Sequence, residues 1–128
     1  MTVTIDNQAG LPAVDSLELR RCLGSFVTGV TVVTALDANG QPEGITANSF
    51  SSLSLDPPLI VWSLRLSSRS FNTYQNAKHF AVNILAQDQV NVSNRFASSG
   101  INRFEGISHR AGLCDVPLID GCASYLEC

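Results

Sequence analysis

A β-hairpin pattern between residues 30 and 49 constrains the fold more than any other feature of the sequence. Val30 to Leu36 is dense in β-branched residues, which favour strands. The next segment, Asp37 to Pro42, contains the pair Asn39-Gly40, a strong signal for a tight turn. Because Glu43 to Ser49 then resumes the extended pattern, the sequence predicts two antiparallel strands joined by that turn.

The rest of the chain alternates short helical and extended patterns. Asp15 and Glu18 resemble a capping box, and the apolar spacing that follows predicts an amphipathic helix ending near Gly29. The further predicted elements are a buried strand at 59–64, a helix at 70–76, a strand at 80–85, a helix at 87–97, a mostly irregular loop at 98–117 and a strand at 123–128. Five strands with short helices predict a mainly β fold, built as a small antiparallel sheet or barrel.

The predicted last strand runs to Cys128 without a turn or cap. A barrel needs its last strands to close its edge, so we expect the sequence to be C-terminally incomplete. A chain of 128 residues is also too short for two independent domains. We therefore divide it into an N-terminal arm, residues 1–14, and one domain, residues 15–128, that lacks its closing strands.

Charged residues are scarce, at 15% of the chain against about 25% in typical proteins. Ser and Asn carry the polarity instead, and they line a pocket or an interface at lower desolvation cost, which is compatible with a homo-oligomer. The net charge of -3 and the single lysine, Lys78, argue against a nucleic-acid partner.

The most apolar stretch, 59–62, is far shorter than the roughly 20 residues of a membrane span, and Asp6 does not suit a signal peptide. We expect a cytoplasmic protein that does not enter a membrane.

Residues for the common catalytic and metal sites are lacking. The spacing of the four cysteines does not fit zinc, so we expect free thiols and no metal. The only histidines are His79 and His109, and no G-x-S-x-G elbow is present, so no Ser/His/Asp triad is indicated. The sequence also lacks the glycine-rich motifs of Rossmann and P-loop nucleotide sites. We therefore assign no catalytic side chain.

The most unusual segment is the serine-rich stretch from Gly44 to Pro58. Its hydroxyls and the Asn48 amide both donate and accept hydrogen bonds, which suits the polar edge of a heteroaromatic ring such as a flavin. Further along, Ser67 to Ser70 precede a predicted helix and would suit a phosphate. The alternative is a solvated serine-rich loop followed by a helix cap, and spacing alone does not separate the two.

Several ordered motifs together resemble the flavin reductase-like family, the small reductase components of two-component flavin-dependent monooxygenases. These motifs are Phe26 to Thr34, Gly44 to Phe50, Ser54 to Leu59, Phe80 to Leu85 and Arg103-Phe104. The resemblance implies an FMN-binding split β-barrel that forms a homodimer and binds FMN or FAD near the subunit interface.

The resemblance also implies which residues contact the flavin. By position, Thr46, Ala47, Asn48 and Ser49 would meet the isoalloxazine edge, Ser52, Ser54 and Leu55 the ring and ribityl chain, and Ser68, Arg69 and Ser70 the phosphate, with Val30, Thr31 and Phe104 as further contacts.

The function that the resemblance implies is an NAD(P)H:flavin oxidoreductase. NADH or NADPH would reduce the bound flavin, and the reduced flavin would pass to a partner oxygenase. Family members continue into a Gly-Asp-His segment whose histidine faces the nicotinamide, and this sequence ends before that point. The alternatives are therefore a flavin-binding module without turnover and a structural dimer with an empty pocket.

Overall fold

The computed structural model describes residues 29–128. The predicted arm and the helix expected from Asp15 lie outside the described residues, which begin at Gly29, where that helix was expected to end. The described chain is mainly β with few helices, as predicted. None of its helices combines the length and hydropathy needed to cross a membrane.

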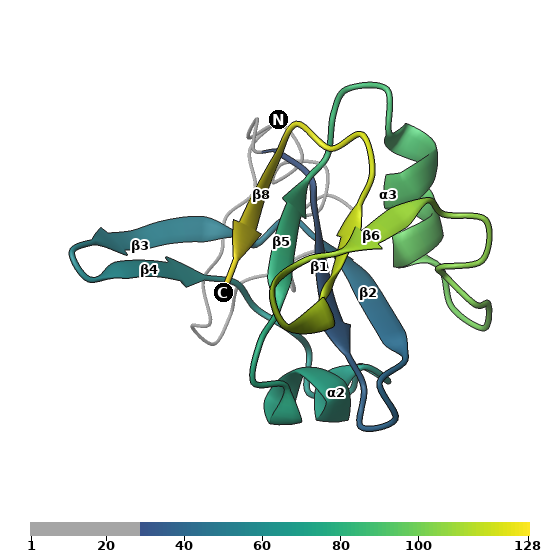
Figure 1. Ribbon diagram of the computed structural model, residues 1–128, viewed down its shortest axis with the longest axis horizontal. Coiled ribbons are helices and arrows are strands. Elements are labelled where there is room, and N and C mark those ends of the chain that lie inside the picture. Colours follow the sequence, from purple (N-terminus) through teal and green to yellow (C-terminus); the bar gives the residue numbers. More distant parts are fainter. Residues whose placement is uncertain (1–28) are drawn as a thin grey trace, which may run out of the picture.

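A four-stranded antiparallel sheet forms the centre of the described fold (Figure 1). Its strands, in spatial order, are β2 (Pro42–Ala47), β1 (Thr31–Leu36), β5 (Ala81–Ile84) and β8 (Ser124–Glu127). The predicted hairpin is confirmed, with Thr31 opposite Ala47 and Leu36 opposite Pro42. Its turn is closed by the Asp37 carboxylate, which accepts the backbone N–H groups of Asn39 and Gln41 at 2.8 Å each.

A second hairpin, which we call the arm hairpin, consists of β3 (Ser51–Leu55) and β4 (Pro58–Val61). It projects from the body of the molecule (Figure 1). The sequence analysis predicted only one strand here, a buried strand at 59–64. The structure has a strand at Pro58–Val61, but it is mostly exposed and pairs with β3, which was not predicted. Most residues of both strands are exposed, although β3 has the alternating sequence Ser52 to Leu55 and β4 has the apolar run Leu59 to Val61. The sequence pattern of this hairpin therefore does not correspond to a buried face.

A third, two-stranded sheet pairs β6 (His109–Ala111) with β7 (Pro117–Ile119) across the short 3-10 helix η1 (Leu113–Asp115). The prediction of a mostly irregular loop at 98–117 missed β6. The chain reverses between the two strands through Cys114 and Asp115, whose φ values are 53° and 62°. Glycine adopts this left-handed backbone most readily and aspartate only occasionally, so neither residue is a strong signal for the reversal.

The central sheet carries apolar clusters on both faces because neighbouring residues of β1 point to opposite sides. Val32 packs with Phe96 of α3 (Val90–Ala97), with Phe104 and with Ile119. Val33 belongs to a second cluster, which includes Trp62 and Tyr74 of α2 (Phe71–Asn76). Both helices lie close to their predicted bounds.

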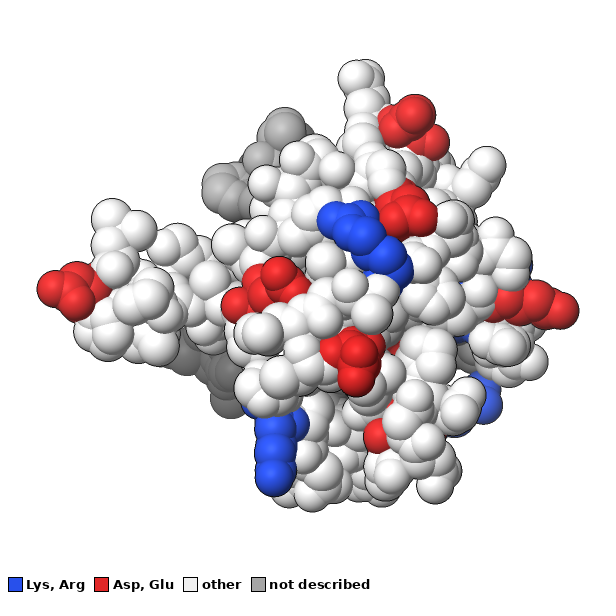
Figure 2. All heavy atoms as spheres, in the orientation of Figure 1, with Lys and Arg blue, Asp and Glu red and all other residues white. Residues whose placement is uncertain are grey.

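The described sheets are open, and no closed barrel is formed within residues 29–128. The split barrel therefore remains a prediction. On the face shown in Figure 2, the Lys and Arg side chains are separated from one another and form no continuous basic patch.

Candidate functional site

A cavity of about 720 Å³, the larger cavity below, lies where β2 ends and the chain turns toward the arm hairpin. The segment 62–69 and the loop after α3 complete its wall. Six of the predicted contacts line it, namely Thr46, Ala47, Asn48, Ser49, Ser68 and Arg69. The structure thus brings together residues from two separate motifs of the sequence.

Two hydroxyl groups of this wall are already engaged in the protein. The Thr46 hydroxyl donates to the Ser93 carbonyl of α3 at 2.6 Å and so ties β2 to that helix. Ser49 Oγ accepts the backbone N–H of Ser63 at 2.9 Å, which holds the two sides of the cavity together. These side chains shape the wall, although the sequence suggested them as ligand donors.

Three other polar side chains of the wall are available to a ligand. Within residues 29–128, the Asn48 amide, the Ser67 hydroxyl and the Arg69 guanidinium make no hydrogen bond or ion pair to protein. The Ser68 hydroxyl accepts the backbone N–H of Ser70 at 3.3 Å and stabilises the turn before α2. Among residues 29–128, the cavity therefore offers an amide, a hydroxyl and a cation without a protein partner.

Arg103 is a wall residue that the sequence analysis did not select. Its Nη1 donates to the Gly44 carbonyl at 2.8 Å, and its Nε donates to the Ser98 carbonyl at 2.8 Å. Arg95 Nε in turn donates to the Arg103 carbonyl at 2.8 Å. These contacts fix the guanidinium at the cavity. A signal for it existed, since the Arg103-Phe104 pair belongs to the motifs that carry the resemblance.

Three predicted contacts lie on the arm hairpin instead of in the larger cavity. Ser52, Ser54 and Leu55 all belong to β3, and the Leu55 side chain is 90% exposed. None of the three lines the larger cavity.

The other predicted residues lie behind or beside the wall. Thr31 is buried, and its hydroxyl donates to the Ala47 carbonyl at 2.7 Å. Val30 precedes β1 and is exposed, and Ser70 is buried beside a neighbouring cavity. Phe104 packs edge-to-face on Phe96 with ring centroids 4.9 Å apart, so it is mainly a core residue.

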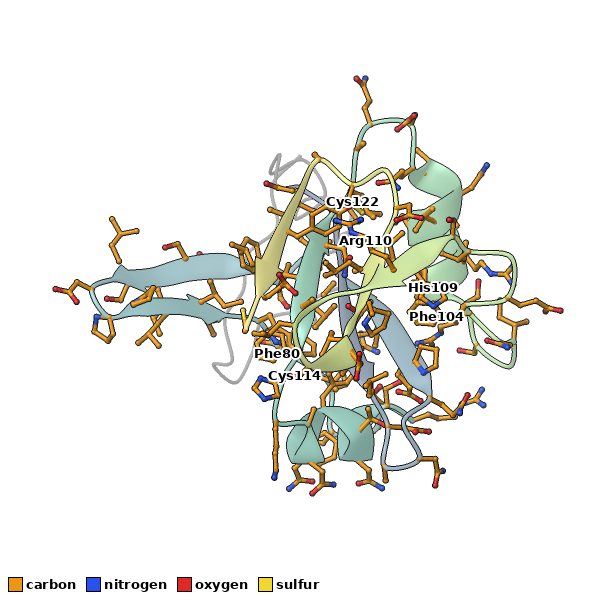
Figure 3. The ribbon with its side chains drawn as sticks, in the orientation of Figure 1. Phe80, Phe104, His109, Arg110, Cys114 and Cys122 are labelled. Carbon is orange, nitrogen blue, oxygen red and sulfur yellow. The ribbon has the colours of Figure 1, made fainter. Side chains whose placement is uncertain are left out.

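His109 and the described cysteines, to which the sequence analysis assigned no catalytic or metal-binding role, lie at other positions. The His109 ring packs against Phe104, with centroids 4.9 Å apart, on the outside of β6 (Figure 3). Cys114, Cys122 and Cys128 are free thiols, and burial raises the pKa of the Cys122 thiol. No group of three His, Cys, Asp or Glu side chains suited to a metal occurs in the described part of the chain.

An aromatic pair, Trp62 and Tyr74, packs at the wall of the larger cavity. Trp62 lines the cavity and meets Tyr74 edge-to-face with ring centroids 5.1 Å apart. The Tyr74 hydroxyl donates to the Val33 carbonyl at 2.7 Å. Burial, with a smaller effect from Glu43, raises the pKa of Tyr74 well above its usual range, so the phenol stays protonated as this donor.

Comparison with known proteins identifies the family of this site. Residues 23–128 match the Flavin reductase like domain. The chain is 46% identical over 111 residues to the reductase component of flavin-dependent trigonelline monooxygenase from Acinetobacter baylyi, covering 87% of this chain and 36% of that protein. It is 43% identical over 114 residues to the FMN reductase (NADH) SmoA from Agrobacterium fabrum, covering 89% of this chain and 64% of that protein.

Solved structures agree with the sequence comparison. The NADH:FAD oxidoreductase SgcE6 from Streptomyces globisporus, solved in complex with NAD and FAD fragments, superposes with a TM-score of 0.81 at 36% identity. The match covers 89% of this chain and 68% of that one. Because the family match extends over most of the sequence, the chain belongs to the flavin reductase like domain family.

Proposed function

We propose that this chain is an NAD(P)H:flavin oxidoreductase that supplies reduced flavin to a partner monooxygenase. The observation that carries the proposal is the larger cavity of a member of this family. It brings together Asn48, Ser67 and Arg69, whose side chains have no partner among the described residues. The relatives named as reductase components of monooxygenases support the partner. The alternative is a flavin-binding domain without turnover.

The residues of the larger cavity fit a flavin. Its volume, about 720 Å³, lies within the range of about 300–1,000 Å³ that is typical of ligand pockets. The Asn48 amide offers both a donor and an acceptor, as the pyrimidine edge of the ring requires. Arg69 and Arg103 offer positive charge for a phosphate, and Trp62 offers apolar surface.

A bound flavin would supply the chemistry of hydride transfer. The protein then has to bind and orient its ligands. Asn48 would orient the polar edge of the ring, and Arg69 would hold the phosphate. The internal hydrogen bonds of Thr46 and Ser49 keep the wall rigid, so little ordering is needed on binding.

A homodimer is part of this proposal. The chain has few charges, and the arm hairpin exposes apolar side chains well away from the body of the subunit. Since the family resemblance implies a flavin near the subunit interface, the arm of one subunit would bring Ser52 and Ser54 toward the cavity of its partner. We also propose that the fold is a split barrel and that the protein is cytoplasmic.

The test of this function is calorimetric titration of the chain with FMN, followed by an NADH oxidation assay. We expect Arg69→Ala to weaken FMN binding by roughly 10- to 100-fold, because a hydrogen bond to a charged group contributes about 1.5–3 kcal/mol. Lys78→Ala, which removes the same charge from a surface outside the larger cavity, should leave the dissociation constant unchanged.

The outcomes separate the proposals. Equal FMN affinity in the Arg69→Ala variant and the parent would contradict the placement of the phosphate. FMN binding without NADH oxidation would favour the flavin-binding domain over the reductase.

A further inference from the structure

A second cavity of about 400 Å³, the smaller cavity, lies next to the larger one. Arg69 and Arg103 line both cavities. The remaining wall of the smaller cavity comes from the start of β2, from Ser70 and from the loop 100–104. Two cationic side chains therefore stand where the two cavities meet.

The smaller cavity differs in character from the larger one. Glu43 lines it, and one carboxylate oxygen, Oε2, is buried without a hydrogen-bond partner among the described residues. A buried carboxylate oxygen is costly to leave unpaired, so a ligand that brings an N–H or O–H donor to Glu43 is favoured. Ile101 and Phe104 add apolar surface beside it.

We propose that the two cavities form one groove for a dinucleotide flavin, so that this chain prefers FAD to FMN. The flavin end occupies the larger cavity, the diphosphate lies at Arg69 and Arg103, and the adenosine occupies the smaller cavity. This inference rests on the proposed function and adds which flavin the site selects.

The arrangement of charge supports the diphosphate. The Arg103 guanidinium is fixed by its hydrogen bonds to two carbonyls, and the Arg69 guanidinium has no partner among the described residues. Two such groups suit a ligand with two linked phosphates, since each can pair with an anionic oxygen. In the smaller cavity, the ribose hydroxyls and the adenine amine of FAD would donate hydrogen bonds to the Glu43 carboxylate, whose Oε2 has no partner among the described residues. FMN has no such group beyond its single phosphate and would leave the smaller cavity empty.

The test compares FMN and FAD by calorimetric titration of the same chain. We expect the parent to bind FAD at least tenfold more tightly than FMN. Ile101 is 49% exposed, and Ile101→Trp places a large ring in the smaller cavity. This variant should bind FAD at least tenfold more weakly than the parent, with FMN affinity within twofold.

Two further variants complete the design. Val90→Trp makes a similar change at a side chain that is 63% exposed and lines neither cavity, and it should alter neither affinity. Glu43→Ala removes the acceptor and should weaken FAD binding several-fold while sparing FMN. ADP should compete with FAD in the parent and should fail to do so in the Ile101→Trp variant.

The adenosine diphosphate half of NAD(P)H carries the same chemistry, so NADH binding to the FMN-loaded chain is measured as well. If Ile101→Trp weakens NADH binding and leaves FAD binding unchanged, the smaller cavity serves the nicotinamide cosubstrate and the proposal is wrong. Equal FMN and FAD affinities in every variant would also overturn it while leaving the proposed function intact. Failure of the parent to bind either flavin would overturn both.

Discussion

At the scale of single residues, Gly44 links the aromatic core to the two cavities. A Cβ atom at this position would lie 2.5 Å from Phe96 Cε1 and 3.3 Å from Phe104 Cε2. The Gly44 carbonyl accepts the hydrogen bond from Arg103 Nη1. The absence of a side chain therefore allows the rings to pack beneath β2 while the backbone holds Arg103 in place.

We expect Gly44→Ala to lower the free energy of unfolding by about 1–3 kcal/mol, because the Phe96 ring must move to admit the methyl group. Flavin affinity should also fall, because the shift of β2 displaces Arg103. The measurements are urea denaturation and flavin titration. Gly29→Ala is the matched control, since its Cβ would meet Ile84 Cγ2 at an ordinary 3.7 Å. Equal stability of the two variants would contradict the packing argument.

Sequence reasoning found those wall residues that are close together in the chain. Thr46 to Ser49 are consecutive, so one motif located them all. It could not find that the Thr46 hydroxyl is engaged by Ser93, which is 47 positions away in the sequence. Arg103 lies in a motif of the family resemblance, but its place at the cavity depends on the fold of its loop back onto β2. Contacts of this range depend on tertiary packing and leave no local pattern.

At the scale of elements, a buried polar network attaches β7 to the central sheet. Asn83 of β5 donates through Nδ2 to the Val32 carbonyl at 2.9 Å, and its Oδ1 accepts the Ile119 N–H at 2.8 Å. The Thr34 hydroxyl donates to the Pro117 carbonyl at 2.6 Å. These bonds hold β7 across β1 and β5 without continuous strand pairing.

Asn83→Ala should therefore destabilise the protein by about 1–3 kcal/mol for each buried group left without a partner. The specific effect should be faster hydrogen exchange at the Ile119 amide, because that N–H loses its acceptor. Native-state exchange measured residue by residue would show it. Asn91→Ala, at an exposed position of α3, should change stability by less than about 0.5 kcal/mol. Unchanged protection at Ile119 would contradict this role of Asn83.

The elements that the sequence could predict are those that depend on local signals. The hairpin of β1 and β2 is local, and its turn residues identify it directly. The pairing of β6 with β7 depends on non-glycine residues at positive φ and on the distant Asn83, so no local pattern indicates it. In the arm hairpin, β4 overlaps the strand predicted at 59–64, whereas β3 was missed. The predicted burial of 59–64 was wrong because no local pattern shows that this hairpin projects from the body of the molecule (Figure 1).

At the scale of the whole molecule, the arm hairpin exposes apolar side chains that nothing in the described chain covers. Leu53 is 64% exposed and Leu55 is 90% exposed, and both lie on the projecting β3 (Figure 1). Asp56 is the only charged residue in the whole hairpin, residues 51–61. Contiguous exposed apolar surface of this kind marks interaction sites, which agrees with the proposed homodimer.

The last prediction concerns this assembly. Light scattering at micromolar concentration should give the parent twice the 13.7 kDa mass of one chain. An obligate interface buries roughly 2,000 Å² or more, so polar changes at its centre should separate the subunits. The double variant Leu53→Ser with Leu55→Ser should therefore shift toward 13.7 kDa and bind flavin more weakly, because the partner's Ser52 and Ser54 are then lost to the cavity.

The matched control for this variant is Val90→Ser with Leu113→Ser. It removes the same kind of exposed apolar side chain outside the arm hairpin and should keep the doubled mass. A parent mass of 13.7 kDa would contradict the homodimer. A double variant that separates the subunits but binds flavin as the parent does would place the whole flavin site within one subunit, because the larger cavity would then suffice without the partner's arm.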